Sequence, residues 1–274
     1  MDRHAADETL DTVATEAFAA LERACQIPPF SSRPRGLSID DAYRVTPRVR
    51  QMFESRGASV KGRKIGFTNR TIWQQYNVYA PIWGYVFDRT VYDLPVTPTL
   101  SLRPFSEPRI EPEIMFGLGS APSAGMDEIE LSACIDWVAL GYEIVQSIYP
   151  GWQFAAADTI AAGGLHGALL IGPRQPFAPR AGEWRRELAD FEIDLNCDGR
   201  LIDRGRAGNV LEGPLSALRH LVELLAQDPV NPPLAAGEIV STGTLTKAMP
   251  VAAGETWTAT PAGVALEDVA IRFV

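Results

Sequence analysis

The sequence predicts an α+β fold with two parts, a helical N-terminal region at residues 1–60 and a mixed β domain at residues 61–274. Before residue 60 the apolar residues recur at helical spacing, whereas after Gly62 they gather in short runs separated by Gly and Pro. A chain of 274 residues is long enough to bury a substantial core. We therefore expect a small helical region joined to one larger β-rich domain.

Two amphipathic helices are predicted in the N-terminal region. The first covers about residues 9–25 and ends before a Pro-Pro pair. The second follows Ser38, which together with Asp41 resembles a helix-starting capping box, and it continues toward Gly57. These helices account for most of the N-terminal region.

At least eight short apolar runs predict strands in the rest of the chain. They are residues 64–67, 82–87, 109–118, 168–171, 191–196, 238–241, 255–259 and 269–273. One helix is predicted at about residues 214–226, where leucines form an apolar face, and residues 228–233 are predicted to form a loop. The sequence shows no internal repeat.

Composition and charge oppose several classes of protein. The net charge of -9 and the lack of a basic stripe oppose nucleic-acid binding, yet allow an anionic small substrate beside a divalent cation. No stretch approaches the roughly twenty apolar residues of a membrane helix, and the N-terminus shows no secretory signal. The three cysteines are far apart and lack metal-ligand spacing. We expect a soluble, cytoplasmic protein without a disulfide framework or a zinc site.

Common nucleotide and hydrolase motifs are missing from the sequence. There is neither a dinucleotide-binding nor a P-loop fingerprint, and no serine stands in a nucleophile-elbow context. A nicotinamide or nucleotide cofactor and a Ser-His-Asp mechanism are therefore poorly supported.

Three glutamates in apolar runs are the most informative feature. In an extended strand Glu111 and Glu113 face the same way, so two carboxylates share one surface. Glu143 lies in another apolar stretch, where a charge is costly unless it is paired, hydrogen-bonded or bound to a metal. Three oxygen ligands with room for water suit Mg²⁺ or Mn²⁺. The alternative is that all three glutamates are solvated.

Lys64 is a candidate for proton transfer. It begins an apolar run, so its side chain could point inward and, near a metal, bind or move protons. Burial and a nearby cation would favour its neutral form, whereas the three glutamates would favour its charged form, so the direction of its pKa shift is open. The alternative is a solvated basic turn formed by Lys61, Arg63 and Lys64.

Two further segments offer polar groups among small residues. Residues 158–167 carry Asp158 and His166, and either side chain could orient a substrate or transfer a proton. Residues 241–246 offer hydroxyl and backbone N–H groups suited to holding a carboxylate, with Thr244 as the candidate contact. The alternatives are a structural histidine in the first segment and an ordinary Thr- and Gly-rich turn in the second.

Taken in order, these motifs resemble a known family. They are Lys-Ile-Gly-Phe-Thr at 64–68, Arg-Ile-Glu-Pro-Glu at 109–113, Glu143, Asp158 and Thr-Gly-Thr at 242–244. The sequence is similar over about residues 9–274 to the 2-keto-4-pentenoate hydratase and 4-oxalocrotonate decarboxylase family of the fumarylacetoacetate hydrolase superfamily. The Glu-x-Glu pair is typical of the superfamily, whereas the Lys-Ile-Gly segment and the helical N-terminus point to this branch.

The resemblance implies a fold, a metal and a reaction. It implies a mixed β-roll core of the fumarylacetoacetate hydrolase C-terminal type, assembly as a homo-oligomer, and possible association with a related decarboxylase or hydratase. It implies Mg²⁺ or Mn²⁺ held by Glu111, Glu113 and Glu143. Substrates of the family are 2-hydroxydienoates or their 2-oxo tautomers, which chelate the metal through the C1 carboxylate and the C2 oxygen.

The leading hypothesis is a metal-dependent hydro-lyase that adds water to a 2-hydroxyalka-2,4-dienoate and forms a 4-hydroxy-2-oxo acid. The metal would stabilise an enolate oxygen. In this reading Lys64 shuttles a proton, Asp158 or His166 positions water, and Thr244 contacts the substrate carboxylate.

Three departures from the family pattern affect the proton-transfer residues. Ile82 stands where hydratases often carry an acid, Ala162 and Gly163 replace a common Asp-Asn pair, and characterised hydratases lack a histidine at the position of His166. The loss of the acid at Ile82 makes a vinylogous 2-oxo acid decarboxylase the nearest alternative. An acylpyruvate C–C hydrolase and a noncatalytic partner subunit are the remaining ones.

The substrate's tail could meet apolar side chains. Ile82 and Trp83 are candidates for substrate contact. Four other aromatic residues could extend the same wall: Trp73, Tyr76, Tyr85 and Trp152. Most of these aromatic side chains could equally belong to the core or to a subunit interface.

Overall fold

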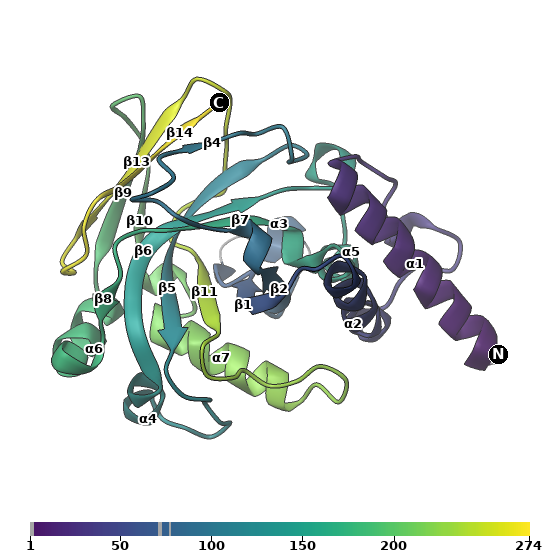
Figure 1. The fold of residues 1–274 in the computed structure, drawn as a ribbon, viewed down its shortest axis with the longest axis horizontal. Coiled ribbons are helices and arrows are strands. Elements are labelled where there is room, and N and C mark those ends of the chain that lie inside the picture. Colours follow the sequence, from purple (N-terminus) through teal and green to yellow (C-terminus); the bar gives the residue numbers. More distant parts are fainter. Residues whose placement is uncertain (1–2, 71–72, 77) are drawn as a thin grey trace.

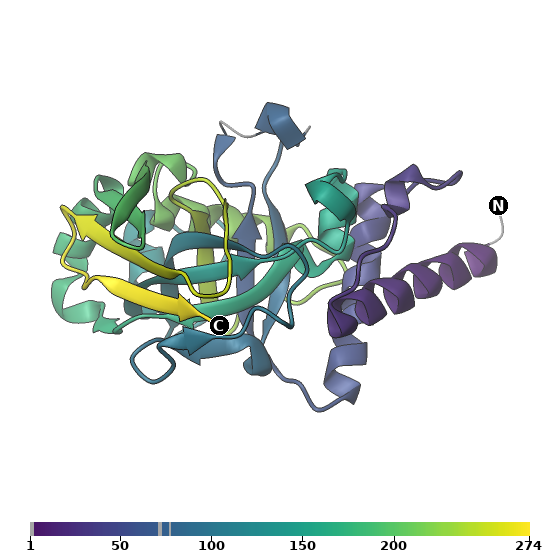
Figure 2. The ribbon, with the colours of Figure 1, turned by 90° about the horizontal axis from the view of Figure 1, so that it is seen from above.

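Two helices at the N-terminus lie together at one end of the β region (Figures 1 and 2). The computed structural model describes residues 3–70, 73–76 and 78–274. Helix α1 spans Arg3–Arg23 and α2 spans Ile39–Ser55. The Ser38 hydroxyl accepts a hydrogen bond from the Asp41 N–H at 3.1 Å, which confirms the predicted start of α2.

The larger sheet has nine strands within the described residues. Its order is β2 (Ile82–Phe87), β1 (Val60–Gly66), β11 (Ile239–Thr244), β5 (Arg109–Leu118), β6 (Ile135–Val145), β7 (His166–Ile171) and β3 (Val91–Asp93). The short strands β12 (Met249–Pro250) and β8 (Gln175–Pro176) pair with β5 and β6. Strand β1 runs parallel to β11 and β3 parallel to β7, whereas the other pairs are antiparallel.

The smaller sheet has five strands in the described part of the chain. Its order is β10 (Arg200–Arg206), β9 (Glu192–Cys197), β13 (Thr256–Ala262), β14 (Val269–Phe273) and β4 (Thr99–Leu100). Inward residues alternate along β14, where Val269, Ile271 and Phe273 are buried. These side chains join residues of β5 and β6 in the main hydrophobic core.

Shorter elements complete the fold. The remaining helices are α3 (Trp73–Tyr76), α4 (Glu128–Ala133), α5 (Ala156–Ala161), α6 (Ala181–Ala189) and α7 (Pro214–Ala226). Single 3-10 turns lie at Phe30–Ser32, Asp88–Thr90, Pro150–Trp152, Gly163–Leu165, Ala178–Arg180 and Ala207–Asn209. A separate core cluster joins α1 and α2 to α5 in the middle of the chain. The N-terminal helices are thus packed against the segment that precedes β7.

The predicted α+β class is confirmed, with curved mixed sheets beside a helical N-terminus. Strands β6 and β10 were not predicted as strands, and the short helices α4, α5 and α6 were not predicted. Helix α5 has only six residues, too few for a helical period to stand out. The division of the chain at residue 60 stays a prediction. Among the described residues, no helix combines the length and apolar character needed to cross a membrane.

Candidate metal centre

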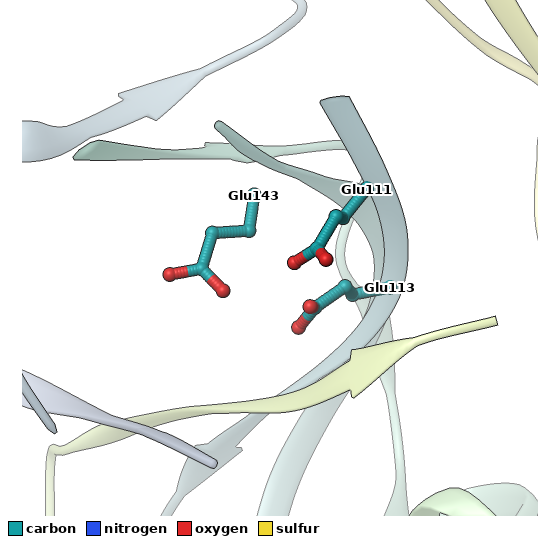
Figure 3. A group of neighbouring side chains, drawn as sticks. All are labelled: Glu111, Glu113 and Glu143. Atoms are coloured by element: carbon teal, nitrogen blue, oxygen red, sulfur yellow. The ribbon is translucent and has the colours of Figure 1, made fainter. Parts of the chain in front are cut away.

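Three carboxylates meet on one face of the larger sheet (Figure 3). Glu111 lies directly opposite Glu143 in the antiparallel pair β5–β6, and Glu113 lies opposite Gly141. One oxygen from each glutamate lies within 4.8 Å of the others. The predicted alternation is confirmed, because Ile110 and Ile114 on the other face of β5 belong to the main core. The pairing of β5 with β6 brings Glu143 to a position that the sequence could not specify.

Two of these carboxylates are fully buried. Glu113 and Glu143 have no exposed area, and Glu111 is half-buried. The alternative of a solvated face is therefore wrong for Glu113 and Glu143. Isolated buried charges are expensive, so the protein must offset them with hydrogen bonds, opposite charges or a cation.

Each buried carboxylate has one anchored oxygen and one without a hydrogen bond. Glu113 Oε2 accepts from the Ser241 hydroxyl at 2.5 Å and from the Gly243 N–H at 2.9 Å. Glu143 Oε1 faces His166 Nδ1 at 2.9 Å. Glu113 Oε1 and Glu143 Oε2 accept no hydrogen bond from any described residue. Such oxygens are the ligands that a hard divalent cation takes.

Burial and mutual repulsion perturb the acids in this cluster. Burial raises the pKa of Glu111 to about 7, and the Glu143 carboxylate adds to this shift. Burial also raises the pKa of Glu113 well above its ordinary value, and both Glu143 and Glu111 add to that shift. Burial also acts to raise the pKa of Glu143, but Lys64 and His166 hold it below its ordinary value. Glu143 is therefore the member of the cluster whose charge is best stabilised by protein.

Lys64 lies in the cluster and not on a solvated turn. Its ammonium nitrogen is 3.0 Å from Glu143 Oε2 and donates to the Gly164 carbonyl at 3.0 Å. Burial lowers its pKa, but the attraction of the three glutamates outweighs burial and the pKa is raised. The ammonium group is thus held beside the cavity by one ion pair and one hydrogen bond. The neighbouring basic residue Arg63 is buried too, and pairs with Glu238 at 2.9 Å.

Glycine is required at two positions around these groups. Gly164 has φ +71, and an added Cβ would lie 2.9 Å from Lys64 Cδ. Gly243 has φ +97, and an added Cβ would lie 1.9 Å from Thr68 Oγ1. Both backbone groups touch the cluster directly, through the Gly164 carbonyl on Lys64 and the Gly243 N–H on Glu113. A larger residue at either position would displace an anchor of the site.

His166 lies behind Glu143. Its Nδ1 faces Glu143, and its Nε2 lies 2.8 Å from the Thr90 hydroxyl. The Thr90 hydroxyl also donates to the Phe87 carbonyl at 2.9 Å, and the Glu143 carboxylate can only accept from Nδ1. The histidine orients Glu143.

A cavity of about 200 Å³ opens onto the carboxylates. Glu111, Glu113 and Lys64 line it together with Ile82 and Thr244. Thr244 Oγ1 already donates to the Thr246 carbonyl at 3.0 Å, which ties it into a turn. The structure thus brings together most of the predicted site residues in one enclosed space.

The segment 241–246 does hold a carboxylate, as its composition suggested, but the carboxylate is that of Glu113. Ser241 and Gly243 supply the two hydrogen bonds. Sequence analysis missed this role because only the β11–β5 pairing places the segment beside Glu113. Thr90 was also missed, and no local pattern marks it.

Asp158 does not reach this cavity. It is fully buried, and its carboxylate accepts from the Ser31 N–H, the Ser31 hydroxyl and the Ala155 N–H. These bonds join the turn at Phe30–Ser32 to the first turn of α5. No described residue of the carboxylate cluster contacts it, so we do not assign Asp158 a catalytic role.

Trp83 also points away from the cavity. Its ring stacks on Tyr43 of α2 with centroids 5.6 Å apart, and it meets Tyr85 edge to face. Trp83 is therefore a core residue, whereas its neighbour Ile82 faces the cavity. Of the other predicted aromatics, Trp152 lines the cavity and the side chain of Tyr76 lies outside the described residues.

A second cavity of about 450 Å³ lies on the other side of His166. Its walls are largely apolar and include Tyr85, Ala162 and Gly163. Ala162 and Gly163, which stand where the resembled family often has an Asp-Asn pair, thus line this second cavity and not the cavity that holds the glutamates.

Comparisons with known proteins identify similar sequences and a similar fold. No family model matches the chain. The chain is 27% identical over 247 residues to the 2-hydroxyhexa-2,4-dienoate hydratase of Comamonas testosteroni. The aligned region covers 90% of this chain and 91% of the relative. The structure is similar to 4-oxalocrotonate decarboxylase of Pseudomonas putida G7 complexed with magnesium and adipate, with a TM-score of 0.88, 25% identity and 98% coverage of both chains.

A more distant likeness extends the fold comparison. Fumarylpyruvate hydrolase of Pseudomonas aeruginosa, solved with Mn²⁺ and pyruvate, has a TM-score of 0.55 and 16% identity over 77% of this chain and 88% of that chain. At this identity the likeness shows the fold alone. Together the two structures confirm the mixed β-roll core expected from the sequence.

Proposed function

We propose that the chain is a member of the 2-keto-4-pentenoate hydratase and 4-oxalocrotonate decarboxylase family of the fumarylacetoacetate hydrolase superfamily and that it is a hydratase dependent on a divalent metal. Its substrate would be a 2-hydroxyalka-2,4-dienoate and its product a 4-hydroxy-2-oxo acid. We propose Mg²⁺ as the metal, with Mn²⁺ as a substitute. Homo-oligomeric assembly, association with a related subunit and a cytoplasmic location stay predictions.

One observation carries the metal assignment. Glu113 and Glu143 are fully buried inside a cluster of three carboxylates, where Glu113 Oε1 accepts no hydrogen bond from the described residues and Glu143 Oε2 faces the Lys64 ammonium at 3.0 Å. A purely structural cluster would leave a large desolvation cost unmatched. The donor set fits a small hard cation that keeps positions open for substrate or water. Glu111, Glu113 and Glu143 would hold this cation.

A bound divalent cation would act as a Lewis acid toward the C1 carboxylate and C2 oxygen of the substrate. Hydration forms a bond from the oxygen of water to C4. Two protons are delivered to the carbon chain, one at C5 and one at C3, while one proton leaves the C2 hydroxyl and one leaves the water. Lys64 is the candidate proton carrier, because it is buried, lines the cavity and lies 3.0 Å from Glu143 Oε2.

His166 would act through Glu143. Its ring is fixed by Thr90 at one nitrogen and by Glu143 at the other, so it orients a carboxylate of the proposed metal site. It lines the second cavity and not the one with the glutamates. We therefore propose a positioning role for His166 in place of water activation.

A 4-oxalocrotonate-type decarboxylase is the second candidate function, because Ile82 presents an apolar side chain to the cavity where hydratases often carry an acid. Decarboxylation breaks the bond between a carboxylate carbon and the conjugated chain. Carbon dioxide leaves, and the electron pair moves into the conjugated system and is later protonated. This reaction uses the same metal site but needs no group to activate water.

Product identification tests the proposal. The purified protein is incubated with fresh 2-hydroxypenta-2,4-dienoate and Mg²⁺, and the products are identified by NMR beside a chelated sample. We expect 4-hydroxy-2-oxopentanoate only in the sample with metal. Carbon dioxide release from 4-oxalocrotonate, with the dienoate unchanged or merely ketonised, would establish the decarboxylase instead.

A further inference from the structure

The second cavity, of about 450 Å³, lies where the two N-terminal helices meet the larger sheet. Leu21 of α1, Val49 of α2 and Phe87 of β2 line it, and His166 of β7 forms part of its wall. Among the described residues, none lines both this cavity and the one with the glutamates. Its volume falls in the range of roughly 300–1,000 Å³ that sites for small molecules occupy. The second cavity is therefore a candidate ligand site separate from the carboxylates.

One turn of backbone separates the two cavities. Residues 161–163 line the second cavity, residues 164 and 165 line the cavity with the glutamates, and residues 166 and 167 line the second cavity again. An added Cβ at Gly163 would meet nothing within 4 Å beyond its chain neighbours, which shows open space on that side. An added Cβ at Gly164 would lie 2.9 Å from Lys64 Cδ, on the other side. The wall between the cavities is thus a single layer of backbone.

This wall, residues 161–167, holds two charged groups of the carboxylate cluster. The Gly164 carbonyl accepts from the Lys64 ammonium at 3.0 Å, and His166 Nδ1 lies 2.9 Å from Glu143 Oε1. Leu165, between them, has φ 63, and a non-glycine residue keeps such a strained conformation only where its surroundings impose it. A molecule packed against the wall from the second cavity therefore touches residues that position Lys64 and Glu143.

The lining of the second cavity suits an apolar molecule. Its polar groups already have partners, because the hydroxyls of Thr46 and Thr90 donate to backbone carbonyls and both ends of the Gln146 amide bond to backbone groups. An apolar cavity of about 150 Å³ is enough for benzene, so this cavity can take a molecule of two rings. Its apolar side chains include Leu21, Val49, Phe53, Phe87, Leu100 and Phe105.

The charged side chains on the same lining favour a neutral ligand. Arg50 pairs with Glu54 at 2.8 Å, and Arg89 pairs with Glu22. The remaining charged or titratable side chain of the lining, His166, faces the glutamate cluster. Because each cationic side chain already has a carboxylate beside it, burying a further ionic group would cost free energy that a neutral molecule avoids.

We propose that the second cavity binds a neutral apolar small molecule, and that this molecule strengthens metal binding in the neighbouring cavity through the wall at residues 161–167. The binding site stands on the geometry of the second cavity alone, whereas the coupling rests on the proposed function, because it requires a metal at the glutamates.

Shared ordering of the wall is the physical cause of the coupling. A ligand packed on the wall restricts Gly164 and His166, and these residues fix Lys64 and Glu143. The metal requires Glu143 in the same place, so whichever ligand binds first reduces the conformational entropy that the second must remove. Coupling between two sites is reciprocal, so Mg²⁺ must strengthen binding of the apolar molecule by the same factor.

A matched pair of probes tests the proposal. 2-Naphthylmethanol is neutral, and 2-naphthoate has the same two rings with a carboxylate. Each is titrated by calorimetry into the protein with chelator and into the protein saturated with Mg²⁺. We expect one 2-naphthylmethanol per chain, at least tenfold weaker binding of 2-naphthoate to the chelated protein, and about fivefold or tighter binding of 2-naphthylmethanol when Mg²⁺ is present. Pyruvate, a short 2-oxo acid able to chelate the metal, should not displace 2-naphthylmethanol.

Two variants that fill the cavity place the probe. Val49→Phe on α2 and Leu21→Trp on α1 each put a larger apolar side chain into the lining and should weaken 2-naphthylmethanol binding at least tenfold. Leu21 is half-buried, so its replacement disturbs packing less than a change at the buried Val49. Val230→Phe is the matched control, because this exposed residue lines neither cavity, and it should bind the probe within about twofold of the wild type. Melting temperatures check that each variant is folded.

The outcomes separate the site, its coupling and the proposed function. Probe binding that survives in both filling variants, or that pyruvate displaces, would overturn the second cavity as the binding site. Equal affinity for 2-naphthylmethanol with and without bound Mg²⁺ would overturn the coupling. If the probe binds and is lost in the filling variants while the protein binds no Mg²⁺ at all, the proposed function fails and the apolar site stands.

Discussion

Asp158 and the pair Glu113 and Glu143 are buried carboxylates that differ in how completely the protein supplies their hydrogen bonds. At Asp158 three donors from Ser31 and Ala155 occupy the carboxylate, and the result is a bridge between an N-terminal turn and α5. At Glu113 and Glu143 the protein anchors one oxygen of each, leaves Glu113 Oε1 without a hydrogen bond and sets Glu143 Oε2 beside the Lys64 ammonium. Both sites are fully buried, so burial alone does not distinguish them.

This difference separates structural acids from functional ones. A buried carboxylate that receives all its hydrogen bonds from the protein stabilises the fold. A buried carboxylate with an oxygen that lacks a hydrogen bond keeps an uncompensated desolvation free energy, which a bound ligand can offset. Sequence analysis treated Asp158 and the glutamates alike as site residues, because hydrogen-bond satisfaction cannot be seen in a sequence. Three experiments test the distinction.

The largest effect is expected for Glu113→Gln. The amide oxygen can keep the bonds from Ser241 and Gly243, but the metal loses a charged ligand, so metal-dependent turnover should fall by at least about a thousandfold while the fold is kept. Burial raises the pKa of Glu113, so the metal-free wild type loses stability as pH rises above the ordinary pKa of an unfolded glutamate, and the uncharged amide avoids this loss. The metal-free variant should therefore unfold at a higher temperature than the wild type at pH 8.

Turnover and melting temperature measured with and without chelator check this expectation. Glu183→Gln, an exposed glutamate on α6, is the matched control and should change neither quantity. Unchanged activity in Glu113→Gln would remove Glu113 from the metal site.

A stability loss without a metal effect is expected for Asp158→Asn. The amide presents a donor where the carboxylate had accepted, so one of the N–H groups of Ser31 or Ala155 loses its partner. The free energy of unfolding should fall by about 1–3 kcal/mol. Denaturant titration measures this loss, and calorimetry should show an unchanged affinity for Mg²⁺.

The exposed Asp190, which follows α6, supplies the comparison variant. Asp190→Asn should stay within about 0.5 kcal/mol of the wild type. A weaker metal affinity in Asp158→Asn at full stability would contradict the structural role of Asp158.

The smallest effect is expected from pH. Burial raises the pKa of Glu111 to about 7, and the metal binds the ionised carboxylate. A proton on Glu111 competes with the metal below pH 7, so the dissociation constant for Mg²⁺ should rise as the pH falls, by up to about tenfold per pH unit for this group. The pKa of Glu113 is also raised, so Glu113 adds to the dependence in the same direction. Calorimetry between pH 5.5 and 8.5 measures this.

The raised pKa of Glu111 also affects the stability of the metal-free protein, which falls as pH rises while the affinity for Mg²⁺ increases. Between the ordinary pKa of an unfolded glutamate and pH 7, the folded metal-free protein binds more protons than the unfolded chain, so its stability falls as pH rises through this window. Each pKa unit corresponds to about 1.4 kcal/mol. The stabilisation by added Mg²⁺ should therefore be greatest above pH 7. A metal affinity that does not change across pH 7 would show that Glu111 is ionised throughout.

Much of the fold could be predicted from local patterns. The helix at Pro214–Ala226 and the strand at Arg109–Leu118 have the predicted bounds, because apolar periodicity and turn residues act over a few positions. Strand β6 was missed although Glu143 was noticed within its apolar stretch. Buried on both sides, β6 lacks the alternation that marks a half-exposed strand.

The sequence by itself determined the class of fold, the face shared by Glu111 and Glu113, and the residue types that suit a divalent cation. These follow from backbone periodicity and from the chemistry of carboxylates, which need no knowledge of distant contacts. Only the tertiary structure decided that Glu143 joins them, that Ser241 serves Glu113, and that Asp158 is satisfied elsewhere. Strand pairing and helix packing join residues far apart in the chain, and hydrogen-bond satisfaction depends on those partners.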